Sequence, residues 1–316
     1  MQIVDEFSAC PWPGERSVVT IGAYDGLHIG HRTIVDRVVA SARASGRRSV
    51  LVTFDRHPAS LVRPESAPKL LTDHAQKIEL LRETGLDAVA VVRFDVAQAA
   101  ESPQDFVRRV LVDCLGVAHI IVGADFHFGK DRAGNVEMLT ALGEAGSGED
   151  RFSVEPVALV SGRVGVTASS TEIRRLLTCG DVAAANAMLG RPFELRGKVA
   201  HGDARGRTIG FPTANIEVPT TMCVPADGVY AAWYVRPGTG ERFPAAVNIG
   251  RRPTFYDNAP VSLIEAHVID RDDLDLYGET AHVRFVARLR GERKFDGLEA
   301  LRTQLAHDVT AARAAL

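Results

Sequence analysis

The amino-acid sequence predicts an α/β protein of two domains: a doubly wound parallel sheet, followed by a small closed β-barrel with a terminal helix. Three observations support this. The chain has 316 residues, more than one hydrophobic core usually organises. Its first half alternates β-branched runs with amphipathic helical segments, and its second half is mostly short strand patterns.

The first half alternates strand and helix patterns, as βαβ units do. Buried strands are expected over 17–23, 49–54, 87–94 and 118–124, and helices over 31–44, 76–85 and 103–115. Strands that alternate with helices imply right-handed crossovers and a parallel sheet. Such sheets bind nucleotides at the carboxyl ends of their strands, so functional residues are expected where these strands end.

The pattern changes after residues 188–192, and we place the domain boundary near 186–195, with domains 1–186 and 187–316. Strands are expected over 195–202, 228–235, 243–250, 262–269 and 281–289, with glycine, proline or Asp/Asn in the gaps. A final helix is expected from Asp296, with Glu299 completing a capping box. Its apolar face would be Leu298, Leu301, Leu305 and Val309. Short strands with one terminal helix favour a small barrel.

Composition argues against several classes of protein. The apolar share of 46% and charged share of 24% are those of globular domains, and the net charge of -3 gives no reason to expect a nucleic-acid partner. The four cysteines form no CxxC pair, which disfavours zinc and a disulfide framework. The first residues have no apolar signal region, and no run is long enough to span a bilayer. We expect a cytoplasmic protein without a membrane partner.

The strongest local motif is GAYDGLHIGH at 22–31, which leaves a buried strand and opens a helix. Such a turn presents free backbone N–H groups and the positive end of the helix dipole, which favour phosphate. Gly22, Gly26 and Gly30 allow close approach of a ligand. His28 and His31 are three residues apart, so both rings can face one anion and neutralise charge on departing pyrophosphate. The alternative is that they only cap or line a helix.

Other motifs follow the later strands. TFDRHP at 53–58 follows the second strand, VGADFHFG at 122–129 the fourth, and SSTEIR at 169–174 opens a later helix. With the first motif they resemble the bacterial bifunctional riboflavin kinase/FMN adenylyltransferase family, over nearly the whole chain. The resemblance implies an HxGH nucleotidylyltransferase-like domain that transfers AMP. Tyr24 and Arg56 stand where the family pattern has Phe and Pro.

The resemblance and the helix start together suggest two sets of ligand residues. In SSTEIR, Ser169 and Glu172 have capping-box spacing, which puts two hydroxyls and a guanidinium at a helix N-terminus, suited to phosphates. The expected ATP-binding residues are Gly22, Asp25, Gly26, Gly30, Asp125, Ser170, Thr171 and Arg174. By resemblance, the residues near the flavin are Phe54, His57, Pro58 and Phe128.

Two competing phosphate motifs fail. The glycines of Gly123 to Gly129-Lys130 are one residue too far apart for a Walker A loop, and Asp131 stands where Ser or Thr would bind magnesium. No GxGxxG follows a strand, which disfavours a dinucleotide-binding dehydrogenase. Adenylyl transfer is consistent with the motifs that remain. The phosphate of FMN is already ionised, so the site needs alignment and charge neutralisation rather than a base.

A second signature, HGDARGRTIGFPTAN at 201–215, is expected in a loop after the first barrel strand. Its glycines and arginines suit phosphate, although an exposed turn with solvated arginines is the plain alternative. The unit GFPTAN matches riboflavin kinases. The expected ATP-binding residues are Gly202, Arg207, Gly210, Pro212, Thr213 and Asn215. Thr213 and Asn215 alternate in an extended segment, so their oxygens point the same way and can hold Mg2+.

Glu265 is the candidate catalytic residue of this half. In SLIEAHVI it shares a face with Leu263, His267 and Ile269, and a carboxylate in such an apolar strand needs a partner or a task. By resemblance it is the general base that takes the proton from the ribityl hydroxyl. The alternative is an edge-strand glutamate that faces water. We interpret His267 as structural. The segments 247–255 and 275–278 also match the kinase pattern.

The resulting hypothesis is sequential. Riboflavin and ATP give FMN at the C-terminal site, and FMN and ATP give FAD at the N-terminal site. The substrates are small molecules, and a homo-oligomer is left open. One rival is a nucleotidylyltransferase whose barrel only binds or regulates, which would need neither GFPTAN nor Glu265. A flavin-storage protein would not need the paired histidines.

Overall fold

The computed structural model describes residues 1–158, 168–201, 205–250, 261–271 and 273–316. By their internal contacts these residues form two compact units. The first comprises Met1–Pro68 and Asp73–Ala168, and the second comprises Lys69–Thr72 and Ser169–Leu316. Each unit buries its own hydrophobic core, and we describe the two separately.

The first unit is built on a six-stranded parallel sheet with the order β1-β4-β3-β2-β5-β8. The strands are β1 (Gln2–Val4), β2 (Ser17–Ile21), β3 (Arg48–Phe54), β4 (Ala88–Val92), β5 (Val117–Gly123) and β8 (Ser153–Val157). The four central strands confirm the prediction. The edge strands β1 and β8 were not expected, because segments of three to five residues are too short to show a clear pattern.

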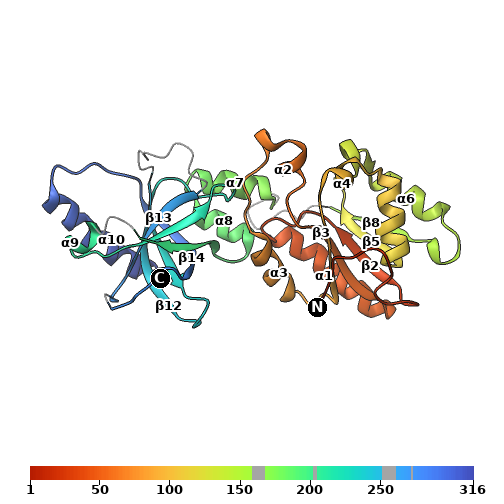
Figure 1. Ribbon diagram of the computed structural model, residues 1–316, viewed down its shortest axis with the longest axis horizontal. Coiled ribbons are helices and arrows are strands. Elements are labelled where there is room, and N and C mark those ends of the chain that lie inside the picture. Colours follow the sequence, from red (N-terminus) through yellow and green to blue (C-terminus); the bar gives the residue numbers. More distant parts are fainter. Residues whose placement is uncertain (159–167, 202–204, 251–260, 272) are drawn as a thin grey trace. The chain divides into compact units, whose positions relative to one another are not determined.

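Helices cover both faces of this sheet, as the doubly wound prediction requires (Figure 1). One face packs on the long helix α1 (Ile29–Ser45) and on α3 (His74–Arg82), through a cluster that contains Val35, Val38 and Leu81. The other packs on η2 (Val107–Cys114), which is π-helical, and on α6 (Val136–Ala145). Between β2 and β5 the strand order reverses direction, which makes their carboxyl ends the usual ligand position.

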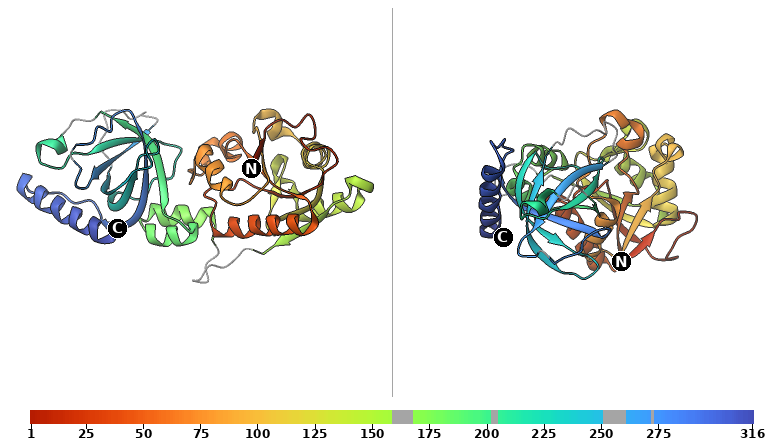
Figure 2. Two further views of the ribbon diagram at one scale, coloured as in Figure 1. Left: turned by 90° about the horizontal axis from the view of Figure 1, so that it is seen from below. Right: turned by 60° about the vertical axis from the view of Figure 1, so that its left-hand side comes forward.

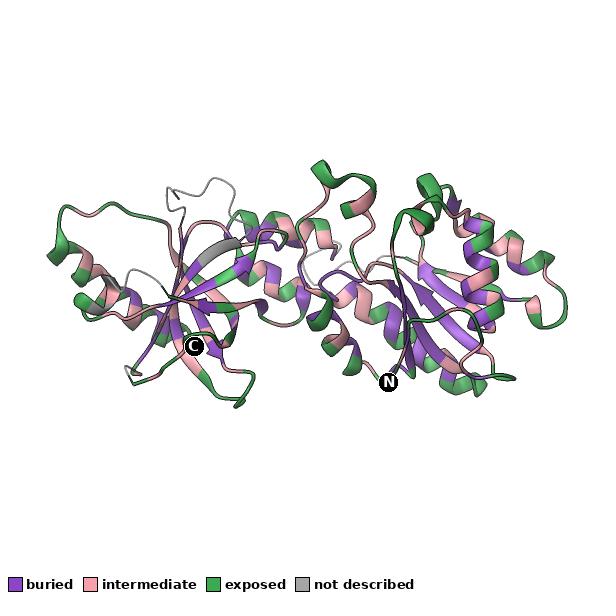
Figure 3. Ribbon diagram, viewed as in Figure 1, coloured by how far each residue is buried: buried purple, intermediate pink, exposed green. Residues whose placement is uncertain are grey.

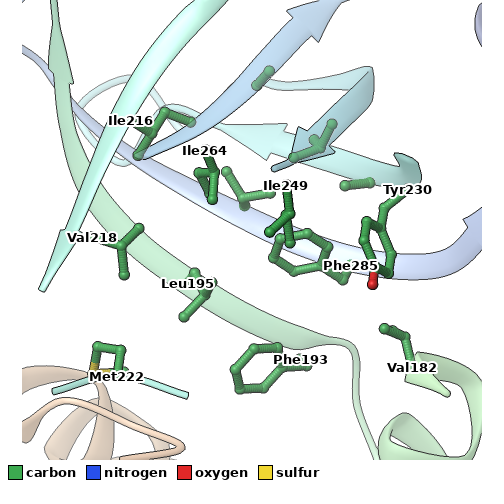
Figure 4. Close-up of a cluster of buried hydrophobic side chains, with 14 of the residues drawn as sticks. Val182, Phe193, Leu195, Ile216, Val218, Met222, Tyr230, Ile249, Ile264 and Phe285 are labelled. Carbon is green, nitrogen blue, oxygen red and sulfur yellow. The ribbon is translucent and has the colours of Figure 1, made fainter. Parts of the chain in front are cut away.

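The second unit is a closed antiparallel barrel with the strand order β10-β13-β12-β11-β14-β9. The strands are β9 (Phe193–Ala200), β10 (Ala214–Pro219), β11 (Gly228–Val235), β12 (Arg242–Ile249), β13 (Val261–Val268) and β14 (Thr280–Arg290). The barrel confirms the predicted class. Alternate residues fill its interior, among them Ile216, Ile249, Ile264 and Phe285 (Figures 3 and 4).

Two helices extend this core beyond the barrel. Helices α7 (Ser170–Thr178) and α8 (Val182–Leu189) contribute Ile173, Leu177 and Val182 to the same buried cluster as Phe193. For this reason the compact units divide at Ser169, whereas the sequence suggested 186/187, a position inside α8. Apolar packing of α7 and α8 is the physical cause of the difference. The functional boundary stays a prediction.

The terminal helix α10 (Leu298–Ala315) packs outside the barrel against β11, β12 and β14 (Figure 2). It begins two residues later than predicted, after Gly297, whose φ of 136° suits only glycine. No side chain caps it, so the predicted capping box was wrong. Of the expected apolar face, Leu298 is 56% exposed, while Leu301, Leu305 and Val309 line a cavity.

The shorter helices and strands lie mostly within the loops between these elements. They are α2 (Ala59–Val62), η1 (Pro64–Ser66), α4 (Val96–Ala100), α5 (Pro103–Phe106), β6 (His127–Phe128), η3 (Lys130–Arg132), β7 (Gly134–Asn135), η4 (Gly148–Asp150) and α9 (Arg205–Thr208). Within the described ranges, no helix is long and apolar enough to cross a membrane.

Candidate active sites

The turn after β2 is conformationally strained. Tyr24, Gly26 and Leu27 have φ angles of 49°, 81° and 36°, so two side-chain-bearing residues occupy the left-handed region. Both are buried, which holds them in this conformation. The hydroxyl of Tyr24 lies 2.5 Å from Thr20 Oγ1, so the tyrosine at this position has a polar partner. Strain that packing maintains is typical of ligand-binding turns.

The two histidines lie against each other at the start of α1. Their rings stack with centroids 3.6 Å apart and planes 20° from parallel. His28 is the N-cap residue, and its Nδ1 accepts a hydrogen bond from the backbone N–H of His31 at 3.3 Å. Hence the neutral ring of His28 carries its proton on Nε2. His28 therefore does cap the helix, and the same geometry places both imidazoles at one helix N-terminus.

The environment of His31 disfavours its charged form. Burial, together with the neighbouring His28, holds the pKa of His31 well below its ordinary value. Its Nδ1 atom is buried, and the described residues offer it no hydrogen-bond partner. A buried polar atom without a partner is costly, and a ligand would supply one. Gly30 packs close by, since a Cβ there would lie 3.2 Å from His28 Nδ1.

An aromatic cavity of about 500 Å³ opens beside this turn. It is lined by Gly22 and by all four residues expected near the flavin, which are Phe54, His57, Pro58 and Phe128. Phe54 ends β3, His57 and Pro58 follow it, and Phe128 follows β5. The structure thus brings the predicted flavin residues together, next to the predicted phosphate turn. Arg56 is exposed and lies 3.4 Å from Asp55, outside the cavity lining.

Sequence reasoning missed three aromatic residues of this cavity: Phe94, Phe106 and Phe126. Phe94 packs edge-on against Phe54 at 5.3 Å, and Phe126 stacks on Phe128 at 5.5 Å. Phe94 and Phe126 follow the carboxyl ends of β4 and β5, and that position was the available signal.

The remaining predicted ATP ligands are more dispersed. Asp25 is buried in the turn, and Asp125 is exposed just after β5, with its carboxylate beside Gly123. Ser170, Thr171 and Arg174 lie on α7, in the second compact unit. Their role toward ATP stays a prediction.

The start of α7 confirms one half of the expected capping box. Ser169 accepts the N–H of Glu172 at 3.2 Å. The Glu172 carboxylate pairs with Arg175 at 2.6 Å. Arg174 donates from Nε to the carbonyl of Lys69 at 2.6 Å. These contacts fix the helix start and the stem of Arg174.

In the second unit, three polar residues form a row across neighbouring strands. Asn215 of β10 is directly opposite Glu265 of β13, which is directly opposite Asn248 of β12. The flanking residues Ile216 and Ile264 point into the barrel, so the row lies on the barrel's outer face. A carboxylate flanked by two amides is a hydrogen-bonding platform, not the isolated edge glutamate of the alternative interpretation.

This row lines a cavity of about 660 Å³ between the barrel and α10. Thr213 and Asn215 lie in the same lining as Glu265. His267 Nδ1 donates to the carbonyl of Pro212 at 2.8 Å, and its ring packs edge-on against Phe211. His267 therefore holds the Phe-Pro step in place, in agreement with its structural interpretation, although it also lines the cavity.

Glycines shape the turn before this step. Gly210 has a φ of 85°, and a Cβ on Gly206 would lie 2.3 Å from the carbonyl oxygen of Phe211. Gly206 also accepts the N–H of Phe211 at 2.8 Å. Gly202 lies outside the described residues, as do 251–255 of the kinase-like segment, and the side chain of Arg207 is likewise not described.

One atom in this cavity indicates a ligand. Asn215 is 6% exposed, and its Oδ1 has no hydrogen-bond partner in the described structure. A buried carbonyl oxygen without a donor, in the same cavity lining as Thr213, is suited to a hard cation. Among the described residues no cluster of three His, Cys, Asp or Glu forms, so such a cation would need further oxygens from a substrate.

Asp308 is a buried acid of this cavity that the sequence did not single out. It accepts two hydrogen bonds from Arg290, at 2.9 and 2.7 Å, and one from Gln304. The pair joins the end of β14 to α10. Asp308 is one residue from Val309 on the predicted apolar face, so an acid beside the apolar stripe was the available signal.

Comparisons with known proteins find a family match for each half of the chain. A family model described as FAD synthetase matches residues 11–171, and one described as riboflavin kinase matches residues 189–316. The bifunctional riboflavin kinase/FMN adenylyltransferase of Escherichia coli K12 is 37% identical over 302 residues, 95% of this chain and 93% of that protein. The Bacillus subtilis protein of the same name is 34% identical over 93% of this chain and 90% of its own length.

A solved structure also resembles the whole chain. It is described as a macrolide-efflux protein from Streptococcus pneumoniae, is 29% identical, and covers 98% of both chains with a TM-score of 0.84. With two family models in the order of the two compact units, and relatives above 30% identity over nearly the full length, the chain belongs to the bifunctional riboflavin kinase/FMN adenylyltransferase family.

Proposed function

We propose that the barrel unit phosphorylates riboflavin to FMN and that the parallel-sheet unit adenylylates FMN to FAD, each with ATP. The observation that carries the proposal is the presence of two separate sites. One is a strained helix-start turn with paired imidazoles beside an aromatic cavity. The other is a cavity whose wall carries the Glu265 carboxylate between two amides.

At the first site, an oxygen of the FMN phosphate attacks the α-phosphorus of ATP, and the bond to pyrophosphate breaks. The nucleophile is already an anion, so no proton has to be removed. His28 and His31 lie at a helix N-terminus, where they can donate to the departing pyrophosphate. The aromatic residues Phe54 and Phe128 would hold the isoalloxazine ring by stacking.

At the second site, the ribityl hydroxyl attacks the γ-phosphorus of ATP, and the bond to ADP breaks. Glu265 takes the hydroxyl proton, because a neutral alcohol is a weak nucleophile. Asn215 and Asn248, opposite Glu265 on both sides, would orient its carboxylate. The glycine turn at 206–210 would cradle phosphate through its backbone N–H groups.

Thr213 and Asn215 would hold Mg2+, which, when bound, neutralises charge on the ATP phosphates. The unpartnered Oδ1 of Asn215 supports this assignment. Small-molecule substrates, a cytoplasmic location and the lack of a nucleic-acid partner complete the proposal, in line with the net charge of -3.

The test is a conversion assay with the full chain. Riboflavin, ATP and magnesium are incubated with the protein, and flavins are separated by chromatography. FMN should appear first and FAD after it, and chelation of magnesium should stop FMN formation. FAD made from supplied FMN, without any conversion of riboflavin, would support the rival in which the barrel is only a binding module.

A further inference from the structure

The first unit contains a buried lysine for which the proposed reaction has no role. Lys77 lies on α3, is 8% exposed, and does not line the aromatic cavity. Its ammonium group donates to Thr53 Oγ1 at 3.1 Å, to the Phe54 carbonyl at 2.9 Å and to the Ala23 carbonyl at 3.4 Å. All three donors of the ammonium therefore have an acceptor.

The acceptors belong to the two segments that form the site. Ala23 lies in the turn between β2 and the paired histidines, and Phe54 ends β3 and lines the aromatic cavity. Pairing between β2 and β3 ends at Ile21 and Val52, followed by one bond from the Gly22 N–H to the Val52 carbonyl. Beyond that point, the strand pairs of the described residues do not hold the two segments at a fixed spacing.

Lys77 and Thr53 supply the missing connection. Thr53 Oγ1 receives a hydrogen bond from Lys77 and donates one to the Ala23 carbonyl at 3.2 Å. The Lys77 side chain thus joins the turn at Ala23 to the segment at Phe54, both directly and through the Thr53 hydroxyl. Burial of the ammonium is unfavourable and lowers the pKa of Lys77 to about 8, against the opposing effect of Asp25 and Asp55.

We propose that Lys77 is a positioning residue for adenylyl transfer, which holds the segment at Ala23 and the segment at Phe54 at the spacing that brings the FMN phosphate to ATP. The proposal rests on the function proposed for the first site. Because the reaction depends on alignment, a displacement of about 1 Å between the two segments can lower the rate by ~10²-fold. Lys77 itself touches neither substrate, and the carbonyls that it holds carry its effect.

The decisive variant is Lys77→Met, which keeps the length of the side chain and removes its donors. We expect kcat for FAD formation from FMN to fall by ~10²-fold, and pyrophosphorolysis of FAD to fall equally, since both directions need the same alignment. Phosphorylation of riboflavin by the same sample should be unchanged and reports an intact barrel unit. Lys77→Arg, which keeps donors at this position, should recover most of the lost rate.

Leu81→Ala is the matched control. Leu81 lies one turn along α3 and is fully buried in the cluster that packs α3 on the sheet. This change should lower thermal stability while kcat, measured well below the melting temperature, stays near that of the unmodified chain. A merely structural role for Lys77 predicts instead that Lys77→Met and Leu81→Ala lose activity only in proportion to unfolded protein.

A Lys77→Met kcat within about threefold of the unmodified value would overturn the proposal. If this variant does not fold, Thr53→Val replaces it, because valine has the shape of threonine but neither accepts from Lys77 nor donates to Ala23. An unchanged kcat in Thr53→Val would then count against the proposal. A His28→Ala/His31→Ala chain that still made FAD would overturn the proposed first site itself, a result distinct from the failure of Lys77 alone.

Discussion

The two candidate sites solve different chemical problems with different parts of the backbone. In the parallel-sheet unit, the site follows the carboxyl ends of β2, β3 and β5, where loops and a helix start converge. In the barrel unit, the site lies on the outer face of three antiparallel strands, where side chains stand at fixed register. The first site is built from turns and the second from a strand platform.

The chemistry explains this difference. A phosphate nucleophile is already ionised, so adenylyl transfer gains most from N–H groups, imidazoles and alignment, which a strained turn provides. An alcohol nucleophile needs a base at a defined position, and a strand fixes Glu265 between Asn215 and Asn248. Under the proposed function, the location of the carboxylate follows the protonation state of the substrate.

Removal of both histidines is the strongest test of this comparison. His28→Ala/His31→Ala removes the side chains at the helix start, so FAD formation from FMN should fall by ~10³-fold or more. FMN formation should continue, because it uses the other unit. Separate chromatographic assays of the two steps give both rates. Equal loss of both activities would mean that the sites are not independent.

Leu177→Ala tests to which compact unit α7 belongs. Leu177 is fully buried in the barrel-side cluster, and its loss should destabilise that unit by about 3 kcal/mol, the usual range for a buried leucine. Kinase activity should then be lost at a temperature roughly 10 °C lower. The matched control, Leu111→Ala, removes a fully buried leucine of the sheet unit and should instead shift the loss of FAD synthesis. The reverse pattern would favour a boundary near 186.

Glu265→Gln tests the base. Glutamine keeps the size of the side chain and its place between the two amides but cannot take a proton, so kinase turnover should fall by ~10²-fold or more. FAD synthesis from supplied FMN should persist, in contrast to the histidine variant. Initial rates with saturating riboflavin and ATP measure the change. Normal kinase turnover in this variant would assign proton removal to another group.

Strong periodicity made the central architecture predictable. The β-branched runs of β2 to β5, the alternation in β13 and the amphipathic α1 each fix one element, and their order implies a parallel sheet and then a barrel. The places of the motif residues in the fold were predictable for a different reason. His28, His31, Thr213 and Asn215 stand where a strand meets a turn or helix, and in parallel sheets ligands bind at the carboxyl ends of the strands.

The rest depends on tertiary contacts that leave no local pattern. Nothing in the sequence of α7 says that Leu177 packs on the barrel rather than on the preceding sheet. The predicted cap at Asp296 failed because the residue directly before the helix is Gly297, whose φ of 136° suits glycine and which has no side chain to cap the helix. Lys77 reads as an ordinary charged helix residue, and only the fold shows that it is buried against two strand ends.

The smallest predicted effect is a pH dependence of stability that arises from the pKa of Lys77. It should appear in the parallel-sheet unit and not in the barrel unit. Burial lowers this pKa from 10.5 to about 8, and the nearby charges of Asp25 and Asp55 act in the opposite direction. Burial and the charge of Lys77 in turn lower the pKa of the neighbouring His74. Between these two pH values the unfolded chain binds more protons at this side chain than the folded chain, so the free energy of unfolding rises with pH. Below about pH 8 the cost of burying the charge is present in full.

From pH 7.5 to 9.5 we expect the parallel-sheet unit to gain about 1–2 kcal/mol relative to Lys77→Met, in which this contribution is absent. Denaturant unfolding of both chains, followed through loss of FAD synthesis, measures the difference, and loss of kinase activity serves as the reference because the barrel unit does not contain Lys77. Parallel stability curves for the two chains would show that Lys77 keeps its ordinary protonation in the folded protein, and a rise in the barrel unit as well would trace the effect to other groups.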